Sequence, residues 1–128
     1  MSKHETPLTL KYWSETGGTL IEEFLVVPAS NECGKRLLDG LILPNGPTKR
    51  VSSREVDFEI AGQDVIVVQT KAKRLGMSLL GQALFSRELL KRHAPMSIRT
   101  VAICTKGDSI LEELAKDYGV EIVVYQTN

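Results

Sequence analysis

Five apolar runs of six to nine residues, each bounded by glycine, proline or polar residues, set the strongest limit on the fold of this chain. Runs of this length with β-branched and aromatic residues predict strands. The predicted strands are Thr19 to Val27, Arg36 to Leu43, Asp64 to Lys71, Ser97 to Thr105, and Val120 to Tyr125. The last two are almost wholly apolar, which predicts a sheet buried on both faces.

Three segments with helical signals lie between or before these strands. A helix is expected to begin at Thr6-Pro7 and to end at Gly17-Gly18, a second to span Ser78 to His93, and a third to begin at Ser109 and end at Gly119. Residues 48 to 64 are polar and alternate around Val56 to Ile60, so we expect an exposed ribbon there. The resulting order, αβββαβαβ, predicts an α/β fold with a mixed central sheet in a single domain over residues 1 to 128.

Composition excludes several protein classes. Hydrophobic residues make up 42% and charged residues 25% of the 128 residues, as in ordinary globular domains. No apolar run approaches the roughly 20 residues that span a bilayer, so no membrane segment is expected. The polar start from Met1 to Thr6 predicts no secretory signal. The two cysteines, Cys33 and Cys104, do not form a zinc or disulfide framework, which fits a reducing compartment and predicts a cytoplasmic protein.

Charge is balanced overall but uneven along the chain. Sixteen basic residues match sixteen acidic ones, which argues against a general nucleic-acid coat protein. Between Lys71 and Arg99, however, seven basic residues stand against Glu88 alone. A neutral protein with one basic segment can still bind a polyanion locally.

Polar residues interrupt three successive predicted strands. Glu22 and Glu23 lie in the first, Asp39 in the second, and Gln69 and Lys71 at the end of the third. Buried carboxylates are costly unless they are paired or bound to a cation, and a divalent metal ion is the natural partner for several oxygen ligands. A hairpin of the first two strands would place only one of the two glutamates on the face of Asp39, and the sequence leaves that choice open.

Structural explanations stand beside this one. Asp39 before Gly40 could mark a strand end, the two glutamates could lie on a solvated edge, and Lys71 could leave the sheet into solvent. Gln82, in the apolar stretch of the second helix, needs hydrogen-bond partners if buried. It is expected either to contact a substrate phosphate or active-site water, or to bond a neighbouring carbonyl.

Asp39, then Gln69-Thr70-Lys71, then a helix bearing Gln82, in the order αβββαβ, resembles the PD-(D/E)xK nuclease superfamily, which has the restriction-endonuclease-like fold. The resemblance covers about Leu8 to Thr105 and leaves a C-terminal αβ extension. The stretches GGTLIEEF, RLLDGLILP and DVIVVQTKAKRLGMSLLGQALFS are similar to a group of small uncharacterised bacterial proteins assigned to that fold.

The resemblance implies a Mg²⁺-dependent or Mn²⁺-dependent deoxyribonuclease that uses one or two ions. Asp39 would be the central metal ligand, with the Gln69 side-chain oxygen and the Thr70 carbonyl beside it, and Glu23 or Glu22 would hold a second ion or a metal-bound water. Lys71 would orient the attacking water or stabilise the developing negative charge. Lys73, Arg74 and Arg87 would bind flanking phosphates of DNA, although a solvated basic face explains them equally well.

One departure from the family pattern keeps a second function open. Gln69 stands where the motif usually has Glu or Asp, and it resembles the Q-x-K branches of the superfamily. Loss of one negative charge should weaken metal binding. The alternative is therefore a catalytically impaired protein that binds nucleic acid or a partner as a regulatory subunit, and a third reading is an ordinary α/β domain with structural polar residues. A homodimer or a partner protein is compatible with the small size.

Overall fold

Strands from both halves of the chain form one mixed sheet in the computed structural model, which describes residues 2–52 and 59–126. The strands in these ranges are β1 (Thr19–Val27), β2 (Arg36–Leu43), β3 (Lys49–Ser52), β4 (Asp64–Thr70), β5 (Ser97–Cys104) and β6 (Val120–Val124). Their order across the sheet is β3-β1-β2-β4-β5-β6. The pairs β1–β2 and β2–β4 are antiparallel, whereas β4–β5, β5–β6 and β1–β3 are parallel. The mixed α/β sheet that the sequence predicts is confirmed.

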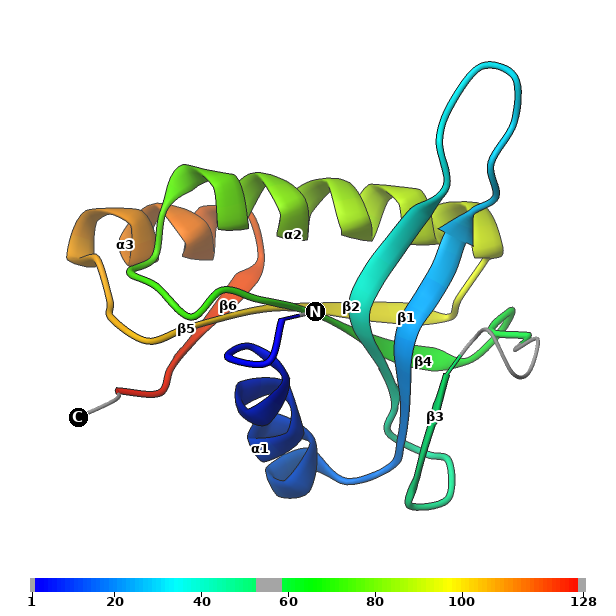
Figure 1. Cartoon of the computed structure of the whole chain (residues 1–128), viewed down its shortest axis with the longest axis horizontal. Helices are drawn as coiled ribbons and strands as arrows, with labels where there is room; N and C mark the ends of the chain where they lie inside the picture. The colour runs from blue at the N-terminus through cyan, green and yellow to red at the C-terminus, as the bar shows by residue number, and fades with distance from the viewer. Residues whose placement is uncertain (1, 53–58, 127–128) are drawn as a thin grey trace.

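Helices cover both faces of this sheet (Figure 1). They are α1 (Thr6–Thr16), α2 (Met77–Leu90), the short 3-10 helix η1 (Lys91–His93) and α3 (Ser109–Asp117). Helix α1 packs on one face, over a cluster that includes Ile66 and Val68, and α2 and α3 pack on the other. Because both faces are covered, all of β4 after its first residue is buried, as the apolar pattern predicts. Within the described residues, no helix is long and apolar enough to cross a membrane.

Glycines end the first helix where the sequence predicts. Gly17 and Gly18 both have positive φ, 80° and 83°. A Cβ atom at Gly18 would lie 2.3 Å from the carbonyl oxygen of Leu43, so only glycine lets the chain turn so close to the end of β2. This turn places α1 beneath the sheet and β1 beside β2 (Figure 1).

The exposed ribbon expected over residues 48 to 64 is only partly open to comparison, because residues 53–58 lie outside the described residues. Its first part forms the edge strand β3 beside β1. Its last part differs from the expectation, since Ile60 is buried among the core residues next to Val65 and Leu90. The sequence did not predict this burial, because a single apolar residue within a polar stretch produces no periodic pattern.

Candidate functional site

Asp39 and Gln69 face each other across neighbouring strands. The ladder between β2 and β4 pairs Gly40 with Val68, so the next step of the same antiparallel register sets Asp39 opposite Gln69. Leu41 and Val67 lie two positions from Asp39 and Gln69, on the same face of each strand, and they pack in a cluster with Leu90 of α2. The two side chains therefore lie on the same face of the sheet, under the second helix.

A groove of about 820 Å³ opens at this point between β2 and α2. We call it the Asp39 groove. Its floor contains Asp39 and Gln69. Its walls are lined by Lys35, Arg36 and Leu37 on one side and by Ser78, Gly81, Gln82, Phe85, Ser86 and Leu89 of α2 on the other. The groove is thus polar and charged at its base and partly apolar along the helix.

The Asp39 carboxylate is half-buried and only partly satisfied. Its Oδ2 accepts a hydrogen bond of 3.0 Å from the Thr70 backbone N–H, whereas Oδ1 has no donor among the described residues. Burial raises the pKa of Asp39 above its ordinary value, against the lowering effects of the Thr70 N–H and the Lys71 charge. A carboxylate held at such a cost, with one oxygen open to a groove, is suited to binding a cation.

Gln69 is oriented by a residue of the second helix. Its side chain is only 5% exposed, and its Nε2 donates a hydrogen bond of 2.8 Å to Ser86 Oγ. This bond leaves the side-chain oxygen of Gln69 without a donor among the described residues. Sequence reasoning missed Ser86, and its only signal was a hydroxyl within an apolar helix stretch.

Thr70 contributes through its backbone. Its N–H points toward β2, where it bonds Asp39, and the carbonyl of a strand residue points to the same side as its N–H. The Thr70 side chain turns to the opposite face, where its Oγ1 lies 2.8 Å from Oγ1 of Thr9 in α1. The carbonyl is therefore directed to the same edge as the Asp39 carboxylate.

Asp39 and Gln69 line the groove, and the Thr70 backbone lies against Asp39, so adjacent residues offer one carboxylate, one amide and one backbone carbonyl as oxygen donors. Hard oxygen ligands of this kind fit a single Mg²⁺ or Mn²⁺ ion. In residues 2–52 and 59–126 no group of three or more His, Cys, Asp or Glu side chains is placed to hold a metal. The donor set therefore carries less negative charge than a site built from several carboxylates.

Lys71 follows directly after β4. Its backbone N–H donates to the Ile103 carbonyl at 2.9 Å, which extends the pairing of β4 and β5 by one residue. Its side chain is half-buried, and its positive charge lowers the pKa of Asp39. The ammonium is thus within electrostatic range of the carboxylate, although Lys71 does not line the Asp39 groove.

The two glutamates of β1 have separate positions. Glu22 forms an ion pair with Arg50 of β3, in which the second contact, Nη2 to Oε2, is 3.1 Å. The register of β1 and β2 sets Glu23, not Glu22, opposite Asp39. Glu23 has a positive φ of 52°, which interrupts the regular alternation of the strand, and neither glutamate lines the groove.

A different carboxylate influences Asp39. Glu5, just before α1, raises the pKa of Asp39 through charge repulsion. Sequence reasoning missed Glu5 because it belongs to a polar start with no periodic pattern. Its position at the beginning of α1 makes it a second acidic group near the site.

The residues expected to contact phosphates occupy different parts of the structure. Lys73 and Arg74 are exposed on the connection between β4 and α2, where the backbone of Arg74 forms an isolated parallel β-bridge with that of Lys106. Gln82 is exposed and lines the Asp39 groove, so it is free to contact a ligand. Lys35 and Arg36 also line the groove, yet sequence reasoning missed them because they lie outside the basic segment.

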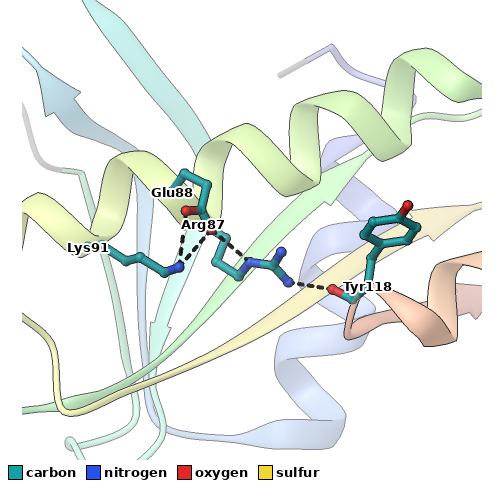
Figure 2. Close-up of polar contacts among 4 residues, drawn as sticks. All are labelled: Arg87, Glu88, Lys91 and Tyr118. Carbon is teal, nitrogen blue, oxygen red and sulfur yellow. Dashed lines mark hydrogen bonds and ion pairs between the residues drawn. The ribbon is translucent and has the colours of Figure 1, made fainter.

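Arg87 has a structural position that the sequence did not indicate. Its Nη1 donates a hydrogen bond of 2.6 Å to the Tyr118 carbonyl at the end of α3, and its Nε lies 3.3 Å from Oε2 of Glu88, which also bonds Lys91 (Figure 2). It does not line the Asp39 groove. Arg87 therefore joins α2 to the end of α3, where a cation stabilises exposed carbonyls.

Replacing this guanidinium tests its role. Arg87→Met is expected to lower the free energy of unfolding by about 1 kcal/mol, because a charged donor to the Tyr118 carbonyl is lost. Urea unfolding would measure the change, with the exposed Arg92→Met as the matched control. Nucleic-acid affinity should stay unchanged. A fall in affinity at unchanged stability would instead make Arg87 a phosphate ligand.

Comparison of the chain with protein-family models, with curated proteins and with solved structures gave no match.

Proposed function

We propose that this chain is a metal-dependent phosphodiesterase that cleaves DNA, with Asp39, Gln69 and Lys71 as the central residues of its site. The observation that carries the proposal is the position of Asp39 opposite Gln69 across β2 and β4, with Lys71 directly after the end of β4. These residues come from distant parts of the sequence. Asp39 and Gln69 share one groove, and the charge of Lys71 acts on the partly satisfied Asp39 carboxylate from just beyond the end of β4.

The order and pairing of elements support the restriction-endonuclease-like fold. Helix α1 precedes an antiparallel series of β1, β2 and β4, and α2 then leads to β5, which runs parallel to β4. Helix α3 and β6 form the C-terminal extension. The αβββαβ core that the resemblance implies is therefore part of the proposal, with β3 as an additional edge strand.

Each residue has a chemical role in this proposal. Asp39 Oδ1, the Gln69 side-chain oxygen and the Thr70 carbonyl would hold the ion. A bound Mg²⁺ or Mn²⁺ supplies charge neutralisation at the phosphate and acidity to water. Lys71 would stabilise negative charge as it develops on the phosphate, from a position at which its charge lowers the pKa of Asp39.

A specific observation also favours a second function. Only one carboxylate lines the Asp39 groove among the described residues. The site therefore offers a divalent ion less negative charge than two carboxylates would, which lowers its metal affinity. The groove could then hold nucleic acid without cutting it. The alternative is a regulatory subunit that binds nucleic acid through the same residues.

A cleavage assay separates the two functions. Supercoiled, linear, branched and single-stranded DNA would be incubated with the wild type in Mg²⁺ or Mn²⁺. Lys71→Met, which keeps the length of the side chain and removes its charge, is expected to cut at least about 100-fold more slowly. The matched control is the exposed Lys116→Met on α3.

The outcomes are distinct. Cutting that Lys71→Met does not slow would contradict this site. No cutting of any of the four substrates by the wild type would overturn the nuclease and favour the binding subunit.

A further inference from the structure

A large aromatic side chain stands exposed on the wall of the Asp39 groove. Phe85 of α2 is 73% exposed and lines the groove. The interior face of the same helix is already filled by residues such as Leu79, Ala83 and Leu90. Phe85 therefore contributes nothing to the core, and its ring is available to a ligand in the groove.

A glycine lies one helical turn before this ring. Gly81 also lines the groove, and positions four residues apart lie on the same side of a helix. A Cβ atom at Gly81 would meet no other heavy atom within 4 Å, and its φ is not in the left-handed region. Neither crowding nor backbone geometry requires a glycine here. Glycine inside a helix lowers stability relative to alanine, so the presence of glycine at position 81 needs another explanation than packing or backbone conformation.

Together these residues form an open platform, which we call the Gly81–Phe85 shelf. Gln82 is exposed beside it, and Lys35 and Arg36 are exposed on the facing side of the groove. Aromatic rings bind the planar faces of bases, whereas lysine and arginine bind phosphates. The groove thus has an exposed aromatic ring on one wall and two exposed cationic side chains on the other.

We propose that the Gly81–Phe85 shelf receives an unpaired base of a single-stranded nucleic acid, with the adjoining phosphates bound by Lys35 and Arg36. This inference rests on the proposed function, because it places the strand along the groove whose floor holds Asp39. It narrows the substrate class from DNA in general to single strands or unpaired segments.

The chemistry of the groove distinguishes this ligand from others. In a duplex the faces of the bases are stacked on one another, so an exposed ring finds no face to contact. A purely apolar partner would have to bury Asp39, Lys35 and Arg36 without partners, which is costly. A single strand offers a free base and phosphates at once.

Binding without metal tests the inference separately from cleavage. Fluorescein-labelled 20-nucleotide DNA and RNA single strands, and the matching DNA duplex, would be titrated in EDTA with the full chain while anisotropy is followed. Phe85→Ala is expected to weaken single-strand binding roughly 5- to 150-fold, the range of one base–aromatic stack. Phe85→Trp should retain it. Ile110→Ala, 77% exposed on α3, is the matched control.

Two substitutions at Gly81, both expected to fold, separate a loss of binding from a loss of folding. Gly81→Leu fills the open space with a good helix former, so it is expected to fold normally and to weaken single-strand binding at least about 5-fold. Gly81→Ala should unfold at a higher urea concentration than the wild type.

Three results would overturn the inference: Phe85→Ala or Gly81→Leu binding as tightly as the wild type, tighter binding of the duplex than of the single strand, or no binding of any oligonucleotide. Cleavage that depends on Lys71 would survive all three, so the shelf can fail while the proposed function stands. Conversely, binding that depends on Phe85 without any cleavage would sustain the shelf and overturn the nuclease.

Discussion

Asp39→Asn is expected to reduce metal-dependent cleavage by at least about 100-fold. Replacing residues that only support metal ligands already lowers metal affinity or activity about 10- to 100-fold. Within residues 2–52 and 59–126, Asp39 is the one carboxylate that lines the groove. Asparagine has nearly the same shape, and its side-chain oxygen can still accept the hydrogen bond from the Thr70 N–H. The loss would therefore report on the missing charge and not on a collapsed strand. Initial cleavage rates in Mg²⁺ and Mn²⁺ would measure it.

The same variant has a second expected result, in stability. Burial raises the pKa of folded Asp39 above its value in the unfolded chain, so the folded state holds this proton more tightly. The Asp39 contribution to stability is then most favourable below the unfolded pKa and is lost as the pH rises through the folded pKa. Asp39→Asn has no such loss. In EDTA, its stability relative to the wild type should rise between about pH 4 and pH 7.

Asp64→Asn is the matched control for both results. Asp64 lies at the other end of β4, where it accepts hydrogen bonds from Ser97 and Asn45. It should leave the cleavage rate unchanged. Urea unfolding at the two pH values would give the stability comparison. An Asp39→Asn variant that cuts at the wild-type rate would remove Asp39 from the mechanism.

Gln69→Glu is expected to bind Mg²⁺ or Mn²⁺ at least about 10-fold more tightly than the wild type. A second carboxylate opposite Asp39 adds a full negative charge to the ligand set, and tenfold corresponds to only about 1.4 kcal/mol. Ser86 Oγ, which now accepts from the Gln69 amide, can instead donate to the new carboxylate. Isothermal titration calorimetry would measure the affinity.

Without metal, the same substitution should be costly. Residue 69 is only 5% exposed, so Gln69→Glu places two carboxylates face to face in a poorly solvated site. We expect the unfolding temperature in EDTA to fall below that of the wild type and to rise more on addition of Mg²⁺. The exposed Gln63→Glu adds the same charge away from the groove and is the control. Unchanged or weaker metal binding by Gln69→Glu would contradict Gln69 as a ligand.

Local signals predicted most of the secondary structure because they depend on neighbouring residues. Pro7 and Gly17-Gly18 bound the first helix, and Asp108 caps α3 by accepting from the Leu111 N–H, one residue before the expected start at Ser109. The expected helix from Ser78 to His93 ends instead as α2 at Leu90 followed by η1. The five predicted strands agree with the structure to within one residue at each end.

The pairing of polar residues across strands depended on long-range register. The polar interruptions at Asp39 and Gln69 were visible in the sequence, but the residues around them do not predict that Gly40 pairs with Val68. The choice between Glu22 and Glu23 depended on the same kind of information, because one residue of register exchanges the two faces of a strand. The positive φ of Glu23 adds a local departure that no periodic pattern contains.

By itself, the sequence determined the α/β class, the order of the three helices and of the five strands other than β3, and the residues that break their apolar pattern, since these follow from periodicity and from glycine and proline positions. Only the tertiary structure decided which of those residues meet. It oriented Gln69 through Ser86, turned Arg87 toward the end of α3, and brought Lys35 and Arg36 to the groove. The physical reason is that side-chain contacts between distant elements arise from strand register and helix docking, which no short window of sequence contains.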